Sequence, residues 1–302
     1  MGRPATPSSD IPPYFNGLTN MWAIFRAVRR MASGYDGILS NHSLTVLPSV
    51  LGANARKKVV YYIQAYEPEY YGALPGIKNK VYEAISRQSY GMGLKQIVNA
   101  PIYLSYKEIE ADACVPPGFD PAHFYPAVTR SSPQGRITLG CIGRHEPHKG
   151  TRDVLEAFEH LYKQDERYWL KVAYGNLPVG WTHPNVEVVI PSGDAELGDF
   201  YRSVDVYLAA GKVQPGAYHY PVMEALACGT PVIHTGYSPG TVENSWIIPQ
   251  GGPVQFAEAI QAIDWNVARS KSMRGLGDVA PLSWPHVTHA FNRHLEDMLA
   301  SR

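Results

Sequence analysis

The sequence predicts an α/β protein with two domains, each built around a parallel sheet. Its 302 residues exceed what one small core needs and suit two domains of roughly 130 to 170 residues. Between residues 136 and 249, short apolar runs alternate with amphipathic segments. This alternation is typical of a doubly wound parallel sheet, which binds ligands at the carboxyl ends of its strands.

The C-terminal half shows this pattern most clearly. Five apolar runs are predicted strands, at 136–143, 168–175, 185–191, 204–210 and 231–236. Between the first two, residues 151–163 place Val154, Leu155, Phe158 and Leu161 on one helical face. Helices are also expected at 197–204, at 221–229 with Pro221 in the first turn and Gly229 just past the end, and at 283–299.

The N-terminal half is less regular. A helix is expected over 17–32, and strands over 36–42, 57–64, 95–101 and 111–117. The proline-rich stretch 116–135 is the best linker candidate and puts the boundary near Thr129. The domains are therefore expected at 1–129 and 130–302, with the terminal helix packing back on a shortened N-terminal domain.

The composition indicates which kinds of partner and which cellular compartment fit this protein. Lys+Arg and Asp+Glu both number 27, which argues against nucleic acid as the main partner. Three scattered cysteines fit neither a disulfide framework nor a zinc site. No apolar run approaches the roughly 18 residues that span a bilayer, and the polar N-terminus lacks the apolar core of a signal peptide. We therefore expect a cytoplasmic protein.

The first candidate site is the loop at 143–150, between a predicted strand and a predicted helix. Helix N-termini bind anions through unpaired N–H groups and a partial positive charge. Arg144 and Lys149 add two full charges at the same place, between Gly143 and Gly150. This arrangement suits a diphosphate. Two solvated loop charges would produce the same local pattern.

The second candidate site is the segment 216–226. Glu224 is expected near the start of a short helix, where its carboxylate can accept hydrogen bonds from the hydroxyls of a ribose. The alternative is that Glu224 only favours the helix N-terminus electrostatically. His145, His148 and His219 lie nearby in the sequence and are expected to be ordinary solvated loop residues.

Together, the two segments resemble glycosyltransferase family 4, the retaining nucleotide-sugar transferases with the GT-B fold. The resemblance rests on G-R-x4-K-G at 143–150 and E-A-L-A-C-G-T-P-V-I at 224–233. It implies two Rossmann-like domains facing a cleft, the N-terminal one reduced. By the same resemblance, Arg144 and Lys149 grip the donor diphosphate as the catalytic pair, and Glu224 binds the ribose.

Three positions depart from the family pattern. The first Glu of the family's E-x7-E motif falls at Gly216, so backbone N–H groups around Tyr218 to Tyr220 are expected to take over part of its work. The family's N-domain His falls at Gln64. The Q-x-Y-E-P run at 64–68 resembles the rhamnosyltransferase-like branch, and it places Gln64 and Glu67 on the donor-sugar or acceptor side. An ordinary polar strand end would also explain these two residues.

The resemblance implies sugar transfer to a glycan or lipid-linked acceptor in surface polysaccharide or glycoconjugate synthesis, with no cofactor and no metal. A UDP- or GDP-hexose enzyme is the alternative within this class. A non-catalytic module that binds a glycan or nucleotide is the alternative outside it. The amphipathic helix with Trp22, Arg26, Arg29 and Arg30 suggests a peripheral contact with the inner face of a membrane, although a solvated basic face explains it as well.

Overall fold

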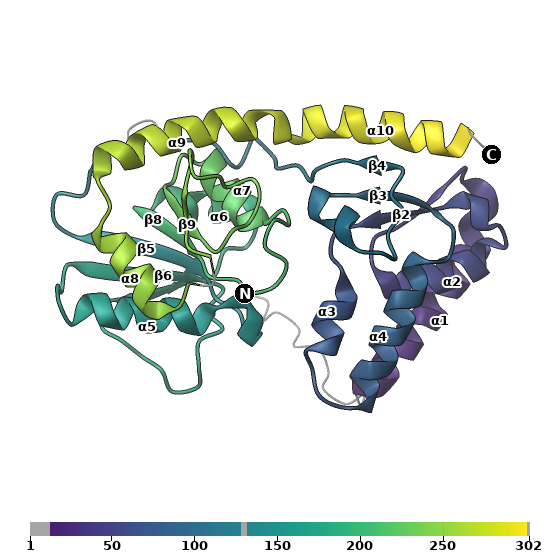
Figure 1. Cartoon of the computed structure of the whole chain (residues 1–302), viewed down its shortest axis with the longest axis horizontal. Coiled ribbons are helices and arrows are strands. Elements are labelled where there is room, and N and C mark those ends of the chain that lie inside the picture. The colour runs from purple at the N-terminus through teal and green to yellow at the C-terminus, as the bar shows by residue number, and fades with distance from the viewer. Residues whose placement is uncertain (1–12, 128–131, 250, 301–302) are drawn as a thin grey trace, which may run out of the picture. The chain divides into compact units, whose positions relative to one another are not determined.

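The computed structural model describes residues 13–127, 132–249 and 251–300, and these form two compact units. Unit 1 contains the chain up to Val115 together with the residues from Phe291 onward, and unit 2 is Pro116–Ala290. Figure 1 shows that each unit has a sheet with helices packed on it. The boundary between the units follows Val115, which is earlier in the chain than the expected boundary near Thr129. Thr129 lies outside the described residues.

Unit 1 contains a four-stranded sheet, and all of its strand pairs are parallel. Its strands, in the order β1-β2-β3-β4, are β1 (Ile38–Ser40), β2 (Val59–Ile63), β3 (Lys95–Val98) and β4 (Ala113–Cys114). Its helices are α1 (Pro13–Met31), α2 (Ser43–Ala53), α3 (Glu67–Gly72) and α4 (Ile77–Tyr90). The expected strands and the first helix are confirmed, while α2, α3 and α4 were not predicted.

The end of the last helix belongs to unit 1. Helix α10 (Trp284–Ala300) begins in unit 2, but its residues from Phe291 cluster with unit 1. The ring of Phe291 meets Tyr62 of β2 edge-on, with centroids 5.2 Å apart. Farther along, the side chain of Leu299 lies so close to Gly37 that a Cβ there would be 2.8 Å from it.

A buried carboxylate joins the helices of unit 1. Glu67, the first residue of α3, is only 6% exposed. One carboxylate oxygen accepts the backbone N–H of Ser43 at the start of α2 (3.3 Å), and the other accepts the hydroxyl of Tyr90 at the end of α4. The Ser43 hydroxyl in turn accepts a hydrogen bond from Ser86 of α4 (2.7 Å). This network holds three helices together from inside the unit.

Unit 2 contains a larger, six-stranded sheet whose pairs are also all parallel. Its strands are β5 (Ile137–Ile142), β6 (Tyr168–Ala173), β7 (Val186–Val189), β8 (Val206–Ala209), β9 (Val232–His234) and β10 (Trp246–Ile247). Its helices are α5 (Thr151–Tyr162), α6 (Asp194–Arg202), α7 (Tyr220–Ala227), α8 (Pro253–Gln261) and α9 (Trp265–Val279). The five strands and the helices expected from 136 to 236 are confirmed.

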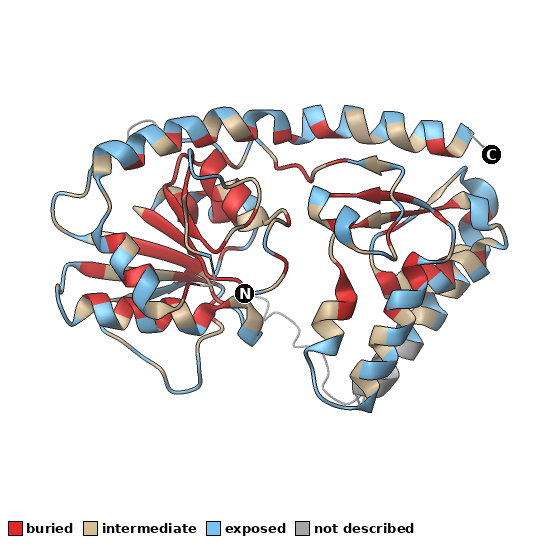
Figure 2. Ribbon diagram, in the orientation of Figure 1, coloured by how far each residue is buried: buried red, intermediate tan, exposed pale blue. Residues whose placement is uncertain are grey.

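Alternate residues of the central strands enter two separate cores. Val206 and Leu208 of β8 join the core under α5 and α8, whereas Tyr207 and Ala209 join the core under α6 and α7. Figure 2 shows the buried strands lying between helices that are exposed on their outer faces. Because strand side chains alternate with a period of two, a strand buried on both faces must be apolar throughout, as β8 is.

All strands of this sheet are parallel, but the direction in which successive strands are added changes between β5 and β8. The strands lie in the order β10-β9-β8-β5-β6-β7, so the chain moves outward from β5 through β7 and then restarts on the other side at β8. The loops that follow β5 and β8 therefore leave neighbouring strands toward opposite sides. Ligands of open parallel sheets bind at such a switch point.

The first prediction concerns the carboxylate of unit 1. Replacing Glu67 with Ala removes the partner of the buried Ser43 N–H and one acceptor of the Tyr90 hydroxyl, which keeps its bond to the Ala65 carbonyl (3.0 Å). We expect Glu67→Ala to lower the free energy of unfolding by about 2–4 kcal/mol in urea denaturation followed by circular dichroism. Glu69→Ala is the matched control on the same helix, because it removes one bond to Tyr106 from a less buried position. Equal stability of both variants would contradict a structural role for Glu67.

Candidate functional site

The loop after β5 begins with a glycine that no other residue can replace without displacing backbone. A Cβ on Gly143 would lie 1.7 Å from the carbonyl oxygen of Gly175. The Gly143 carbonyl also accepts a hydrogen bond from the Asn176 side chain (2.9 Å), and the Arg144 N–H donates to the hydroxyl of Thr151 (2.8 Å). The backbone around Arg144 is thus held between the end of β6 and the start of α5.

The same loop ends in a second constrained glycine. After the 3₁₀ turn Pro147–Lys149, Gly150 adopts φ +75°, and a Cβ there would lie 1.9 Å from the carbonyl oxygen of Ala210. The Lys212 N–H donates to the His148 carbonyl (2.9 Å), and the Lys212 ammonium pairs with Asp153 of α5 (2.6 Å). The loops after β5 and β8 therefore touch at Gly150 and Lys212, and α5 begins at Thr151 as expected.

Arg144 and Lys149 form a positively charged centre in this loop. Arg144 is exposed and Lys149 is half-buried. Burial lowers the pKa of Lys149, and the nearby charge of Arg144 lowers it further, while Glu146 opposes the shift. Two cations this close disfavour each other's charge, and an anion bound between them relieves that cost. This charge arrangement would suit an anion, and anion binding at this loop stays a prediction.

Glu224 lies deeper in the structure than the sequence suggested. It is the fifth residue of α7, in the second turn and not near the helix start. The helix dipole acts mainly within the first turn, so dipole stabilisation does not explain this carboxylate. The Tyr201 hydroxyl donates to its Oε2 atom (2.8 Å). Burial raises the pKa of Glu224 to about 7, against the effect of this hydrogen bond.

Tyr174 is affected by charges from both predicted segments. Burial raises the pKa of Tyr174, which follows β6, and the charges of Glu224 and Asp194 raise it further while Arg144 lowers it. Tyr174 therefore lies within reach of both Glu224 and Arg144. The loop after β5 thus supplies a cationic pair, and α7, which follows the loop after β8, supplies a half-buried carboxylate. Tyr174 itself was not predicted, because its place in the site depends on the strand order.

The loop before α7 is held by hydrogen bonds to the loop after β9. The Gly216 N–H donates to the Gly236 carbonyl (2.7 Å), and the His219 N–H donates to the Ser238 carbonyl (2.9 Å). The His219 amide is therefore occupied, which corrects part of the expectation that amides from Tyr218 to Tyr220 bind the donor. Tyr218 and Tyr220 are half-buried and pack against the core under α7. Gly216 adopts φ +93°, a conformation that a Glu would rarely take.

Gln64 and Glu67 lie in unit 1. Gln64 directly follows β2, and its carbonyl accepts the Tyr103 hydroxyl (2.8 Å). Glu67 is buried, and both of its carboxylate oxygens are bonded within the unit. The expectation that Glu67 lies on the donor-sugar or acceptor side does not fit this burial, because a ligand would have to displace its partners. Gln64 is half-buried, and its proposed role stays a prediction.

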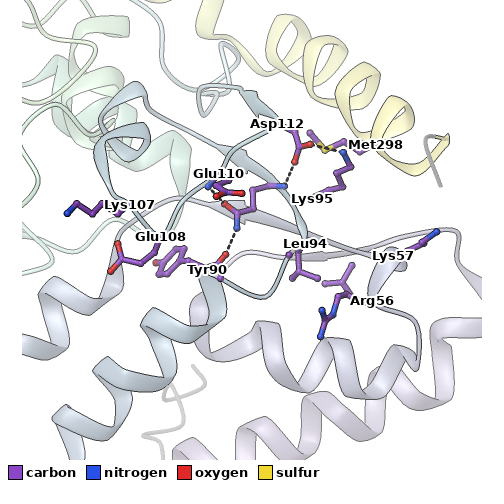
Figure 3. A pocket seen from close by; sticks show the side chains of 14 residues that line it. Arg56, Lys57, Tyr90, Leu94, Lys95, Lys107, Glu108, Glu110, Asp112 and Met298 are labelled. Atoms are coloured by element: carbon purple, nitrogen blue, oxygen red, sulfur yellow. Dashed lines mark hydrogen bonds and ion pairs between the residues drawn. The ribbon is translucent and has the colours of Figure 1, made fainter.

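A separate hollow of about 760 Å³ lies elsewhere in unit 1 (Figure 3). It is lined by the first residues of β2 and β3, Val59 and Lys95, and so lies at the amino ends of these strands. Its charged lining residues are of both signs: Arg56, Lys57, Lys95, Lys107, Glu108, Glu110 and Asp112. Lys95 and Asp112 pair with each other (2.7 Å). Neither the position nor the mixed charge resembles the anion site of unit 2.

Two further expectations concern metals and membranes. Among the described residues, no three His, Cys, Asp or Glu side chains are grouped so that they could hold a metal ion. None of the helices in the described ranges is both long and apolar enough to cross a membrane. On α1, Trp22 is 60% exposed and the side chains of Arg26, Arg29 and Arg30 are also exposed. Peripheral membrane contact through this helix stays a prediction.

Known proteins resemble this chain in sequence. Residues 136–263 match the family model described as glycosyl transferases group 1. The chain is 25% identical over 232 residues to a D-inositol 3-phosphate glycosyltransferase of Kineococcus radiotolerans. The alignment covers 62% of this chain and 53% of the relative, so the chain spans about half the length of this curated protein.

Solved structures share the fold of the whole chain. Sucrose-phosphate synthase from Thermosynechococcus elongatus superposes with a TM-score of 0.77 at 18% identity, covering 99% of this chain and 82% of that one. Anabaena HepE in complex with UDP-glucose superposes with a TM-score of 0.71 at 14% identity, covering 91% and 82%. The chain therefore has the GT-B fold, with two Rossmann-like units. The segment of unit 2 that matches the group 1 glycosyl transferase model contains Arg144, Lys149 and Glu224.

The close approach at Gly150 gives a second prediction. Gly150→Ala must relieve both a positive φ and a contact with the Ala210 carbonyl, so we expect a loss of about 3 kcal/mol or more in the free energy of unfolding. Gly180 has nearly the same φ, +77°, but open space around its Cβ position. Gly180→Ala should therefore cost only about 1–2 kcal/mol. Similar losses in urea denaturation would mean that the two loops do not approach as described.

Proposed function

We propose that the chain is a retaining glycosyltransferase that moves a sugar from a nucleoside diphosphate to a hydroxyl of an acceptor. One observation supports this proposal: Arg144 and Lys149 follow β5 at the switch point of the unit 2 sheet, and the charges of Arg144 and Glu224 both act on Tyr174 after β6. A cationic pair suits the diphosphate, and a half-buried carboxylate suits the ribose hydroxyls. A module that only binds glycans would have no use for the cationic pair.

The cations act on the leaving group. As the bond between sugar and diphosphate breaks, negative charge grows on the diphosphate. Arg144, Lys149 and the N-terminus of α5 supply positive charge that is already in place, so little reorganisation is needed during the reaction. Retention of configuration and independence of metal are part of the proposal, and they rest on the family resemblance.

The leading donor is dTDP-rhamnose. Gly216 and Gln64 stand where the family has Glu and His, so this site has fewer side chains for sugar hydroxyls. A site with fewer such partners suits a 6-deoxy sugar, because buried polar groups without partners are costly. A UDP- or GDP-hexose is the second candidate, supported by the likeness in fold to HepE, which is solved in complex with UDP-glucose.

For the acceptor, we propose a glycan or a lipid-linked glycan in cell-surface polysaccharide or glycoconjugate synthesis in the cytoplasm. This proposal rests on the resemblance and on the exposed Trp22 and arginines of α1.

Donor hydrolysis tests the function directly. The full chain is incubated with dTDP-rhamnose, UDP-glucose and GDP-mannose, and release of the nucleoside diphosphate is measured with and without EDTA. Release from dTDP-rhamnose that EDTA does not change would support the full proposal. Preference for a donor with a free 6-hydroxyl would reject rhamnose only. Binding without release from any donor, also in the presence of added glycan acceptors, would favour the non-catalytic alternative.

A third prediction concerns the cationic pair. Arg144→Ala and Lys149→Ala each remove a charge-assisted contact to the diphosphate, worth about 1.5–3 kcal/mol. We expect each variant to bind the nucleoside diphosphate about 10- to 100-fold more weakly and to lose most transfer, while binding of the free nucleoside changes little. Lys212→Ala is a control, because this lysine is paired with Asp153 nearby. Equal losses for nucleoside and diphosphate in titration calorimetry would reject the assignment.

A fourth prediction concerns the proton on Glu224. Hydrogen bonds from ribose hydroxyls favour the carboxylate over the acid, so binding should lower the pKa of Glu224 from about 7 and release a proton. Binding of a nucleotide sugar should therefore strengthen as the pH rises toward 7, because a smaller fraction of Glu224 is protonated and has to lose its proton on binding. Calorimetry at about pH 6.5 in buffers of different ionisation enthalpy measures the release.

Glu224→Gln is the control for this proton. It should bind more weakly and release no proton, while remaining folded. Without ligand, the wild-type protein should lose stability relative to Glu224→Gln as the pH rises from about 4.5 to about 7, because the folded state holds this proton more tightly than the unfolded state. Unchanged proton release in the variant would remove Glu224 from the site.

A further inference from the structure

His219 stands at the start of α7, the helix that carries Glu224. It follows the loop after β8 and is the N-cap residue of α7, three residues after Gly216 and five before Glu224. The sequence suggested an ordinary solvated loop histidine. The structure instead encloses its Nδ1 atom, which has no hydrogen-bond partner among the described residues.

The imidazole ring is held in a defined orientation. It stacks on Tyr237 with ring centroids 4.7 Å apart and an angle of 25° between the planes. The Tyr237 hydroxyl donates to the Val213 carbonyl (2.8 Å), and the His219 N–H donates to the Ser238 carbonyl (2.9 Å). The ring is therefore fixed both by its backbone and by the aromatic side chain under it.

The surroundings keep this ring neutral. Burial lowers the pKa of His219 to about 3, and the charges of Lys149, His234 and Arg144 add to the effect. A neutral imidazole carries one proton, and the tautomer that avoids a buried unpaired N–H carries it on Nε2. The residue keeps partial exposure although Nδ1 is enclosed, so the opposite edge of the ring, with Nε2, is the edge open to a ligand.

A neutral donor beside two cations suits a hydroxyl better than a phosphate. Arg144 and Lys149 already supply the charge for the diphosphate. The donor sugar is attached to that diphosphate, and the loop position expected to bind it, Gly216, has no side chain. His219 is the nearby side chain that combines a fixed ring with an open hydrogen-bonding edge.

We propose that His219 donates a hydrogen bond from Nε2 to a hydroxyl of the donor sugar and so replaces the carboxylate that is missing at Gly216. The inference rests on the proposed function and adds a residue that distinguishes a nucleotide sugar from the free nucleotide. His219 is thus a specificity-determining residue for the sugar part of the donor.

The test compares nucleotides with and without the sugar. UDP, GDP and dTDP and the corresponding UDP-glucose, GDP-mannose and dTDP-rhamnose are titrated into wild-type protein and into three variants. His219→Phe keeps a ring to stack on Tyr237 but has no nitrogen. His219→Gln places an amide near the position of Nε2, whereas His219→Asn places one near Nδ1.

For the nucleotide sugar that wild-type protein binds best, we expect His219→Phe to weaken binding about tenfold, and to change binding of its free nucleotide by less than about twofold. His219→Gln should recover most of the loss, and His219→Asn should not. Equal weakening of nucleotide and nucleotide sugar, or no weakening of either, would overturn the proposal.

Tyr237→Phe separates a hydrogen bond to the sugar from a structural role. This variant loses the hydrogen bond to the Val213 carbonyl. The loss perturbs the loop, but the imidazole of His219 is still present. We expect this variant to preserve the discrimination between nucleotide and nucleotide sugar, and a loss equal to that of His219→Phe would show that His219 acts only through the loop. Wild-type protein that binds no nucleotide would reject the proposed function itself. Wild-type protein that binds normally, with no effect of His219→Phe, rejects only the role of His219.

Discussion

The contact between Gly150 and the carbonyl of Ala210 is the constraint on which the candidate site depends. It joins the loops that leave β5 and β8, the neighbouring strands between which the strand order changes direction. A side chain at position 150 would force these loops apart, and the cationic pair would move away from the segment that precedes Glu224. The site is thus set by the backbone first, and its charged side chains depend on that arrangement.

Partial burial shifts the pKa values of Lys149 and Glu224. Lys149 is half-buried and its pKa is lowered, while the pKa of Glu224 is raised to about 7. Both shifts show that the unliganded site disfavours its own charged forms. A ligand with a diphosphate and a ribose would offset both costs at once, because it brings negative charge to the cations and hydroxyl donors to the carboxylate. The same surroundings keep His219 neutral.

In unit 1, the carboxylate of Glu67 has a structural role, unlike the role proposed for Glu224 in unit 2. Glu67 belongs to the segment that resembled a sugar-side motif, yet it joins α2, α3 and α4 from inside the unit. A carboxylate followed by proline at a strand end looks the same in sequence whether it faces solvent or the core. Its partners, Ser43 and Tyr90, are both more than twenty residues away along the chain.

From the sequence alone, five strands of unit 2, its helices α5, α6 and α7, and the motifs around Arg144 and Glu224 could be recognised, because apolar periodicity and short motifs are local properties of the chain. The sequence missed α2, α3, α4, α8 and α9, and it placed Glu224 too near the start of its helix. The charges around Tyr174, the stacking of His219 on Tyr237 and the burial of Glu67 could not be predicted, because each depends on strand order and on contacts between distant segments. Burial and pKa are properties of such contacts, so they emerge only when the chain is folded.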